Sequence, residues 1–322
     1  MATQYEQTEQ TIHGFQINAG ESVTAEQVGD RYQIDHAQFN LPLESIRQLL
    51  SAFDQKQGED YACAELEHQS WEPETVLIPA GSFLMGSDPE EGIPDWETRQ
   101  FTMDLPAYRI GKYPVTNAEF ALFMQETKRF AAKGLGWRNG QPSPEQNNLP
   151  VMGVTWYDAL AYCVWLYEKT ERPYTLPSEV QWEKAARGTD GFIFPWGNEW
   201  QEGMCNTDHQ QVTAVDQYPH NESQFGCCDM IGNVREWTTT AWGRNRRYNV
   251  DFKSPYPWTT WKVNEGSDRI NAHPQMRRVT RGGASLLPDI PLRIARRQSE
   301  LPYRHGTRQN RVGFRVVLNW GT

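Results

Sequence analysis

The part of the chain after Gly188 is rich in Trp, Pro and Gly residues and contains no long segment with helical or strand periodicity. A backbone of this length leaves many N–H and C=O groups to be satisfied by something other than regular pairing. Buried tryptophans, side-chain hydrogen bonds to the backbone and bound cations are the means available. We therefore expect a loop-rich region held together by side chains, with metal as a candidate structural element.

Regular elements are predicted before that point. Residues 76–87 predict a strand, a glycine turn and a second strand, and three helices are expected to begin near residues 116, 155 and 178. Thr116 or Asn117 can cap the first helix, and Thr155 with Asp158 forms a variant capping box at the second. The residues expected to face inward are Phe120, Phe123 and Met124 in the first helix and Ala159, Tyr162, Cys163 and Leu166 in the second.

Residues 1–70 are predicted to form a separate N-terminal segment. Residues 15–20 and 28–34 alternate apolar and polar side chains and predict short strands, while residues 41–56 predict an amphipathic helix. Such a helix suits an adaptor or tether that docks a protein partner, and a flexible tail is the alternative. One domain is expected to follow, over residues 72–319.

The net charge of the chain limits the classes of partner that it can bind. The net charge is −10, with 41 acidic and 31 basic residues, which argues against nucleic-acid binding. The basic residues are nevertheless uneven, because ten arginines and only two acidic residues lie between residues 277 and 315.

The five cysteines are odd in number and show no CxxC spacing, so neither a zinc site nor a disulfide scaffold is expected. We interpret the adjacent Cys227 and Cys228 as small apolar fillers, with a vicinal disulfide or a redox pair as the alternative. The first residues lack the pattern of a secretory signal, and no apolar run is long enough to span a membrane. A cytoplasmic protein with reduced thiols is expected.

Several motifs, in order along the chain, carry a family resemblance. They are IPAGSFLMGS at residues 78–87, PVTNAEF at 114–120, PVMGVTWYDA at 150–159, YTLPSEVQWEKAAR at 174–187 with PWGN at 195–198, and DMIGNVREW at 229–237 with RGG at 281–283 and GFR at 313–315. This set resembles the formylglycine-generating enzyme, or sulfatase-modifying factor, family. The resemblance implies an α+β, C-type-lectin-like fold with little regular secondary structure.

The catalytic cysteines of that family are missing from the positions where the resemblance places them. In the family, a cysteine after the RGG-like motif and a second one five residues later bind copper and oxidise a substrate cysteine. Leu287 and Leu292 stand at these positions, and an aliphatic side chain cannot ligate a metal. Some relatives hold iron through histidines and a carboxylate, but His13, His36 and His68 are too widely separated for that motif. Neither copper nor iron is expected, and no catalytic residue is assigned.

The resemblance also implies a structural calcium ion under the DMIGNVREW loop. Its ligands would be side-chain oxygens of Asp229 and Glu236 and the backbone carbonyls of Gly232 and Val234, a mixture that a hard cation prefers. The alternative is that both carboxylates accept backbone N–H bonds in a tight turn. A second family calcium site would begin at Asn206, but the shortened loop that follows leaves little room for its ligands.

Residues 284–311 are predicted to form the binding surface, because the family presents this region as its binding or catalytic face. Arg and Tyr are the side chains that most often anchor an interface. We expect Arg281, Arg293 and Arg315 to be structural and Arg297, Arg304 and Arg308 to be exposed. The candidate ligand-binding residues are Ser285, Leu286, Leu287, Asp289, Ile290, Leu292, Arg297, Tyr303, Arg304, His305 and Arg308.

Two classes of function lead, and nucleic-acid binding through the arginines of residues 277–315 is a third that the net charge opposes. The leading hypothesis is a non-catalytic module that recognises a protein or another macromolecule through residues 284–311. Specific versions are a binder diversified by a retroelement and an accessory of a bacterial conflict system, since residues 28–32 resemble segments found in such systems. The alternative is a metal-dependent oxidoreductase that uses a site without cysteine.

Overall fold

The computed structural model describes residues 68–88, 100–129, 135, 137–207, 211–242, 277–283, 292–303 and 311–318. The strands and helix predicted within residues 1–70 lie outside these ranges. Among the described helices, none combines the length and the apolar character that a membrane crossing requires.

The described strands form three sheets. Their order is β1-β4-β10-β5 in one four-stranded sheet, β2-β3 in a two-stranded sheet and β8-β7-β6-β9 in the second four-stranded sheet. The strands are β1 (Thr75–Ile78), β2 (Gly81–Met85), β3 (Phe101–Leu105), β4 (Tyr108–Gly111), β5 (Tyr174–Thr175), β6 (Gly232–Ala241), β7 (Arg278–Gly283), β8 (Arg297–Glu300), β9 (Val312–Gly313) and β10 (Val317–Leu318).

The helices begin where the sequence places them. They are α3 (Asn117–Glu126), α4 (Trp156–Thr170), α5 (Glu179–Arg187) and the short 3₁₀ helix η3 (Pro144–Gln146). Each α-helix opens with a capping box, in which the hydroxyl of the cap and the side chain three residues later each accept a backbone N–H bond. The caps are Thr116, Thr155 and Ser178, so the first two predicted helix starts are confirmed in detail.

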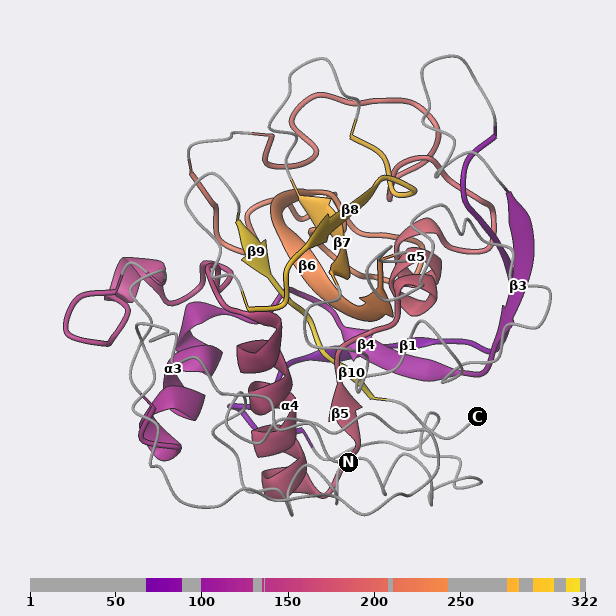
Figure 1. Ribbon diagram of the computed structural model, residues 1–322. Coiled ribbons are helices and arrows are strands. Elements are labelled where there is room, and N and C mark those ends of the chain that lie inside the picture. The colour runs from indigo at the N-terminus through magenta and orange to yellow at the C-terminus, as the bar shows by residue number, and fades with distance from the viewer. Residues whose placement is uncertain are drawn as a thin grey trace, which may run out of the picture.

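The first of two hydrophobic cores surrounds α3 and α4, which lie side by side in Figure 1. It buries the residues predicted to face inward from both helices, including Phe120, Phe123 and Tyr162. Their rings contact one another, and Tyr162 also contacts Trp165 with ring centroids 5.3 Å apart. We call this part of the molecule the aromatic lobe.

The second core lies between α5 and the strands. Trp182 of α5 packs there with Ile110 of β4, Met230 and Ile294, all of which are buried. The sheet β8-β7-β6-β9 borders this core, and Figure 1 shows α5 beside it. We call this part the ionic lobe, for the charged contacts described below.

Strand β6 lies in the region that the sequence predicted to be rich in loops and without a long segment of strand periodicity. It is ten residues long and buried along its whole length, pairing with β7 on one side and with β9 on the other. A strand buried on both faces shows no alternation of polar and apolar residues. Its Arg, Glu and Thr side chains bond to other parts of the protein, so its sequence does not look like a core strand.

Candidate functional site

A buried ionic centre joins α5 to β7 and β8. Glu179 and Glu183 lie one turn apart on α5, and Arg281 of β7 reaches both: its Nη1 lies 3.1 Å from Glu179 Oε1 and its Nη2 contacts Glu183 Oε2. Arg297 of β8 also binds Glu179, donating from Nη2 to Oε2 over 2.8 Å. Glu179 and Arg281 are fully buried. Such charges are stable in the interior only because they are paired.

A second centre holds the C-terminal strands against β6. Arg315 donates from Nε and Nη2 to the two carboxylate oxygens of Glu236, at 2.6 and 2.8 Å. It also donates to the carbonyls of Gly111 and Cys228, and Trp182 Nε1 donates to Glu236 Oε2. Burial alone would lower the pKa of Arg315, but the adjacent Glu236 raises it above the ordinary value. The guanidinium therefore stays charged.

These contacts decide most of the predicted roles for the arginines. Arg281, Arg293 and Arg315 are buried, as expected for structural residues. The prediction that Arg297 is exposed is wrong. Only 10% of its side chain is exposed, because it forms the ion pair with Glu179.

The predicted contact surface is only partly described. Leu292 was expected to be a surface contact, but it is 9% exposed and packs in the core of the ionic lobe, so that expectation is wrong. Tyr303 is 50% exposed and can contact a partner. The remaining candidates lie outside the described residues: Ser285, Leu286, Leu287, Asp289, Ile290, Arg304, His305 and Arg308.

Further arginines gather beneath β8, next to this surface. Arg235 of β6 donates to Gln298 over 3.2 Å, and Arg277 donates to the carbonyl of Ser299. Burial lowers the pKa of Arg235 to about 10, with Glu300 acting in the opposite direction and the neighbouring Arg296 and Arg277 adding to the decrease. Glu300 lies 3.8 Å from Arg277 and partly balances these arginines, and Arg235 itself is buried.

The predicted calcium loop lies at the start of β6. Both carboxylate oxygens of Glu236 accept bonds from Arg315, so the charge that would attract a cation is already neutralised. Gly232 and Val234, whose backbone carbonyls are predicted calcium ligands, are buried in β6. A divalent ion bound by Glu236 would lie against a guanidinium, and like charges repel strongly in the interior.

Asp229, the remaining predicted ligand, is also engaged by the protein. It has a positive φ of 55° and accepts a bond from Asn233 Nδ2 at 2.8 Å. Burial raises its pKa to about 7 despite that hydrogen bond. Within the described residues, no group of three His, Cys, Asp or Glu side chains is arranged to hold a metal. The contacts fit a centre made of protein groups better than one containing Glu236-bound calcium, and calcium stays a prediction.

The described cysteines are buried and free. Burial raises the pKa of Cys227 to about 12 and that of Cys228 to about 11. A thiol of this kind does not ionise near neutral pH, and the thiolate is the reactive form. The interpretation of both as apolar fillers is supported.

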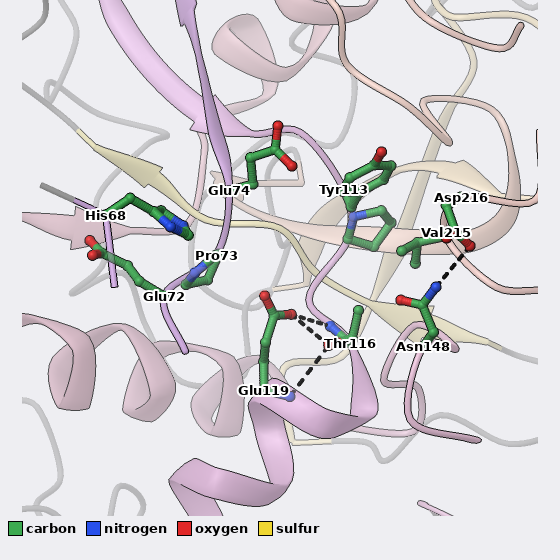
Figure 2. A pocket seen from close by; sticks show the side chains of 11 residues that line it. His68, Glu72, Pro73, Glu74, Tyr113, Thr116, Glu119, Asn148, Val215 and Asp216 are labelled. Atoms are coloured by element: carbon green, nitrogen blue, oxygen red, sulfur yellow. Dashed lines mark hydrogen bonds between the residues drawn. The ribbon is translucent and has the colours of Figure 1, made fainter. Parts of the chain in front are cut away.

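A pocket of about 270 Å³ lies at another place, where four separated segments meet (Figure 2). Residues 68–74 form one wall, residues 113–119 form the opposite wall and the beginning of α3, and Asn148 with residues 215–216 closes one side. Sequence reasoning missed this pocket because no single motif contains it. The only signal was the capping box of α3, which fixes the position of Glu119, one of the lining residues.

The carboxylates of the pocket differ in their partners. Glu72 accepts a bond from Arg172 at 2.6 Å and another from the Tyr174 hydroxyl, and Glu74 lies 3.5 Å from Lys112. Asp216 accepts a bond from the neutral amide of Asn148 at 2.8 Å.

Glu119 lies at the base of the pocket. Its Oε2 accepts bonds from the N–H and the hydroxyl of Thr116, both at 2.7 Å. Figure 2 shows its carboxylate rising from α3 towards Pro73 and Glu74. Burial raises the pKa of Glu119, while the bonds from Thr116 and the nearby His68 act in the opposite direction.

Comparison with known proteins places this geometry in a family. The family described as sulfatase-modifying factor enzyme 1-like domain matches residues 62–320. The chain belongs to this family. The C-type-lectin-like fold expected from the motifs is confirmed.

Relatives of this sulfatase-modifying factor domain include enzymes and inactive forms. The inactive C-alpha-formylglycine-generating enzyme 2 of Mus musculus is 30% identical over 223 residues, which cover 53% of this chain and 70% of that protein. The formylglycine-generating enzyme of Mus musculus is 28% identical over 251 residues, covering 61% and 64% respectively. The structure of PvdO from Pseudomonas aeruginosa matches with a TM-score of 0.59 and 27% identity, covering 78% of this chain and 96% of that one.

Proposed function

We propose that this sulfatase-modifying factor domain is a non-catalytic recognition module that binds a protein or another macromolecule through residues 284–311. The observation that carries the proposal is Leu292. It occupies a position where the family resemblance places a copper-binding cysteine, and its aliphatic side chain packs in the core. A relative that is 30% identical carries the name of an inactive enzyme, so loss of catalysis has a parallel in the family.

The structure around the proposed surface favours recognition for a second reason. Arg297 and Arg281 fix β8 to α5 through Glu179, so the described part of the surface rests on a rigid base. A preorganised surface loses less entropy when it binds. The exposed Tyr303 and Arg277, whose side chain is 37% exposed, suit a partner with an acidic, partly apolar face.

The proposal extends to the setting of the protein. The module acts in the bacterial cytoplasm, and residues 1–70 dock a second protein partner or tether the domain. A binder diversified by a retroelement and a conflict-system accessory are both versions of this role. Membranes and nucleic acids are not its ligands, since the net charge of −10 opposes polyanions.

The test compares partner binding by wild type and by a triple variant, Leu287→Ala, Tyr303→Ala and Arg304→Ala. A partner recovered by affinity capture is purified, and its dissociation constant is measured by calorimetry. We expect at least a tenfold loss in the triple variant, because Tyr and Arg anchors each contribute about 1–2 kcal/mol or more. Leu77→Ala is the matched control, since Leu77 is 37% exposed on β1 and should leave binding unchanged.

The alternative is a metal-dependent oxidoreductase with a site that lacks cysteine. Purified protein is incubated in air with copper or iron and a cysteine-containing peptide, and oxygen consumption is followed. Metal-dependent turnover of the peptide would overturn the recognition proposal.

A further inference from the structure

We propose that the pocket of Figure 2 binds an organic cation, a guanidinium or primary ammonium group on a short aliphatic stem, with Glu119 as its counter-ion. The described lining of this site includes no residue of 292–303, and the inference does not depend on the function proposed for residues 284–311. Three features of the pocket support a bound cation: the charges of the lining, the role of Glu119 in α3 and the shape of the walls.

The lining is acidic and keeps uncompensated charge. Its described residues include four carboxylates and one histidine, but neither lysine nor arginine. Arg172 pairs with Glu72 and Lys112 lies near Glu74, so these two carboxylates have cationic partners. Glu119 and Asp216 accept bonds only from neutral groups among the described residues, and the imidazole of His68 is the one basic group of the described lining, set against four carboxylates. The pocket therefore holds negative charge that a bound cation would balance.

Glu119 presents one oxygen to the pocket. Oε2 accepts both bonds from Thr116, and Oε1 accepts none from the described residues. The carboxylate is surrounded closely enough by protein that desolvation raises its pKa. An anion with an unused acceptor in such surroundings is less stable than one in water, and a cationic ligand removes that penalty.

The charge of Glu119 is not needed to begin α3. A capping box works with either Glu or Gln at its third position. The chain itself shows this at α5, where Gln181 takes the same place opposite Ser178. The hydrogen bonds of the box therefore explain a Gln at position 119 as well as a Glu, and the negative charge is left for another role.

The walls favour an organic cation over a metal ion. Pro73, Pro114 and Val215 offer apolar surface that a methylene stem can contact. The acidic side chains do not converge, because no group of three metal-ligating side chains occurs among the described residues. The volume of about 270 Å³ is near the lower limit for small-molecule pockets, so the ligand is a small group or the end of a side chain.

The test measures binding of propylguanidinium to the full chain by NMR chemical shift and calorimetry. We expect a dissociation constant of about 1 mM or tighter, and at least tenfold weaker binding of propylurea, its neutral isostere. Glu119→Gln should weaken propylguanidinium binding at least tenfold and keep the melting temperature within about 2 °C, because the capping box survives. Asp158→Asn is the matched control: it alters the box of α4, outside the pocket, and should leave binding unchanged.

Two further arms identify the source of the cation. A short peptide with one arginine reports whether a protein side chain enters the pocket, and free agmatine reports whether a small amine does; binding of either that depends on Glu119 supports the proposal. Equal binding of propylurea, unchanged binding by Glu119→Gln, or a response to magnesium or calcium alone would overturn it.

Discussion

The aromatic lobe and the ionic lobe are stabilised by different kinds of buried contact. In the aromatic lobe, two capped helices bury a continuous set of rings, with Phe120, Phe123 and Tyr162 in mutual contact. In the ionic lobe, helix α5 and the strands are joined by buried pairs such as Arg281 with Glu179. The first lobe relies on apolar area, and the second relies on charges matched in position.

This difference has a physical reason. Apolar contact is not directional, so it suits helices whose backbone is already satisfied. A loop has no such internal pairing, and a guanidinium with five donors can fix several distant segments at once. Arg315 does so by binding Glu236 and the carbonyls of Gly111 and Cys228. The ionic lobe should therefore tolerate change much less well than the aromatic lobe.

The largest effect is expected from Arg281→Met. The change keeps an apolar stem of similar length but removes the guanidinium that binds both Glu179 and Glu183, leaving only Arg297 for the first and Arg187, 3.5 Å away, for the second. Breaking a buried pair in this way costs about 3–5 kcal/mol of unfolding free energy. Urea unfolding followed by tryptophan fluorescence gives the value.

Leu166→Met is the matched change in the aromatic lobe, where Leu166 is fully buried. A swap that conserves volume should cost less than about 1.5 kcal/mol. If both variants lost the same stability, the contrast between the two lobes would be refuted.

The next largest effect is expected from Asp229 of the ionic lobe, which should make the free energy of unfolding depend on pH. Burial raises the pKa of Asp229 to about 7, above its unfolded value, so the folded state binds this proton more tightly. Its contribution to stability is present below about pH 4 and is lost as the pH rises towards 7, by at most about 1.4 kcal/mol per pH unit. Asp229→Asn should abolish this pH dependence. The measurement is the difference in unfolding free energy between wild type and variant at each pH. A difference that stays constant from pH 4 to 8 would contradict the prediction.

Removing a helix cap should have a smaller effect on the free energy of unfolding, and the effect should be equal in the two lobes. Thr155→Ala and Ser178→Ala each remove a helix cap, one in α4 and one in α5. Each should cost about 1 kcal/mol, because capping satisfies local backbone groups whatever the surrounding core. Chemical denaturation of both variants provides the comparison. A cost several times larger for Ser178→Ala would show that the cap is coupled to the ionic centre.

The smallest effect is expected from removal of calcium. Arg315 already neutralises Glu236, so a chelator should shift the melting temperature by less than about 3 °C, which corresponds to about 1 kcal/mol at this size. Differential scanning calorimetry with EGTA, and then with added calcium, measures the shift. A fall of 10 °C that calcium reverses would establish the ion as part of the ionic lobe.

The sequence predicted the aromatic lobe well because its signals are local. Thr116 and Thr155 lie within three residues of the groups they cap, and the inward-facing residues repeat with helical spacing. The family motifs then supplied the fold for the loops that follow.

The ionic lobe and the pocket depend on pairings that no local pattern contains. Glu179 meets Arg281 and Arg297 across more than 100 residues of sequence, so Arg297 looked like a surface residue until its partner was known. Leu292 looked exposed for the same reason, since its burial depends on the second core. The pocket was missed because its walls come from four segments.

The position of β10 has a consequence for how the protein is made. This two-residue strand lies between β4 and β5, and Arg315 just before it binds carbonyls in the first half of the chain. A nascent chain therefore cannot complete this sheet until residue 318 has left the ribosome. Until then, the facing edges of β4 and β5 stay open to wrong pairing. A chain truncated before Val317 should lack β10 and therefore the link between β4 and β5. Such chains should be found with chaperones or in aggregates.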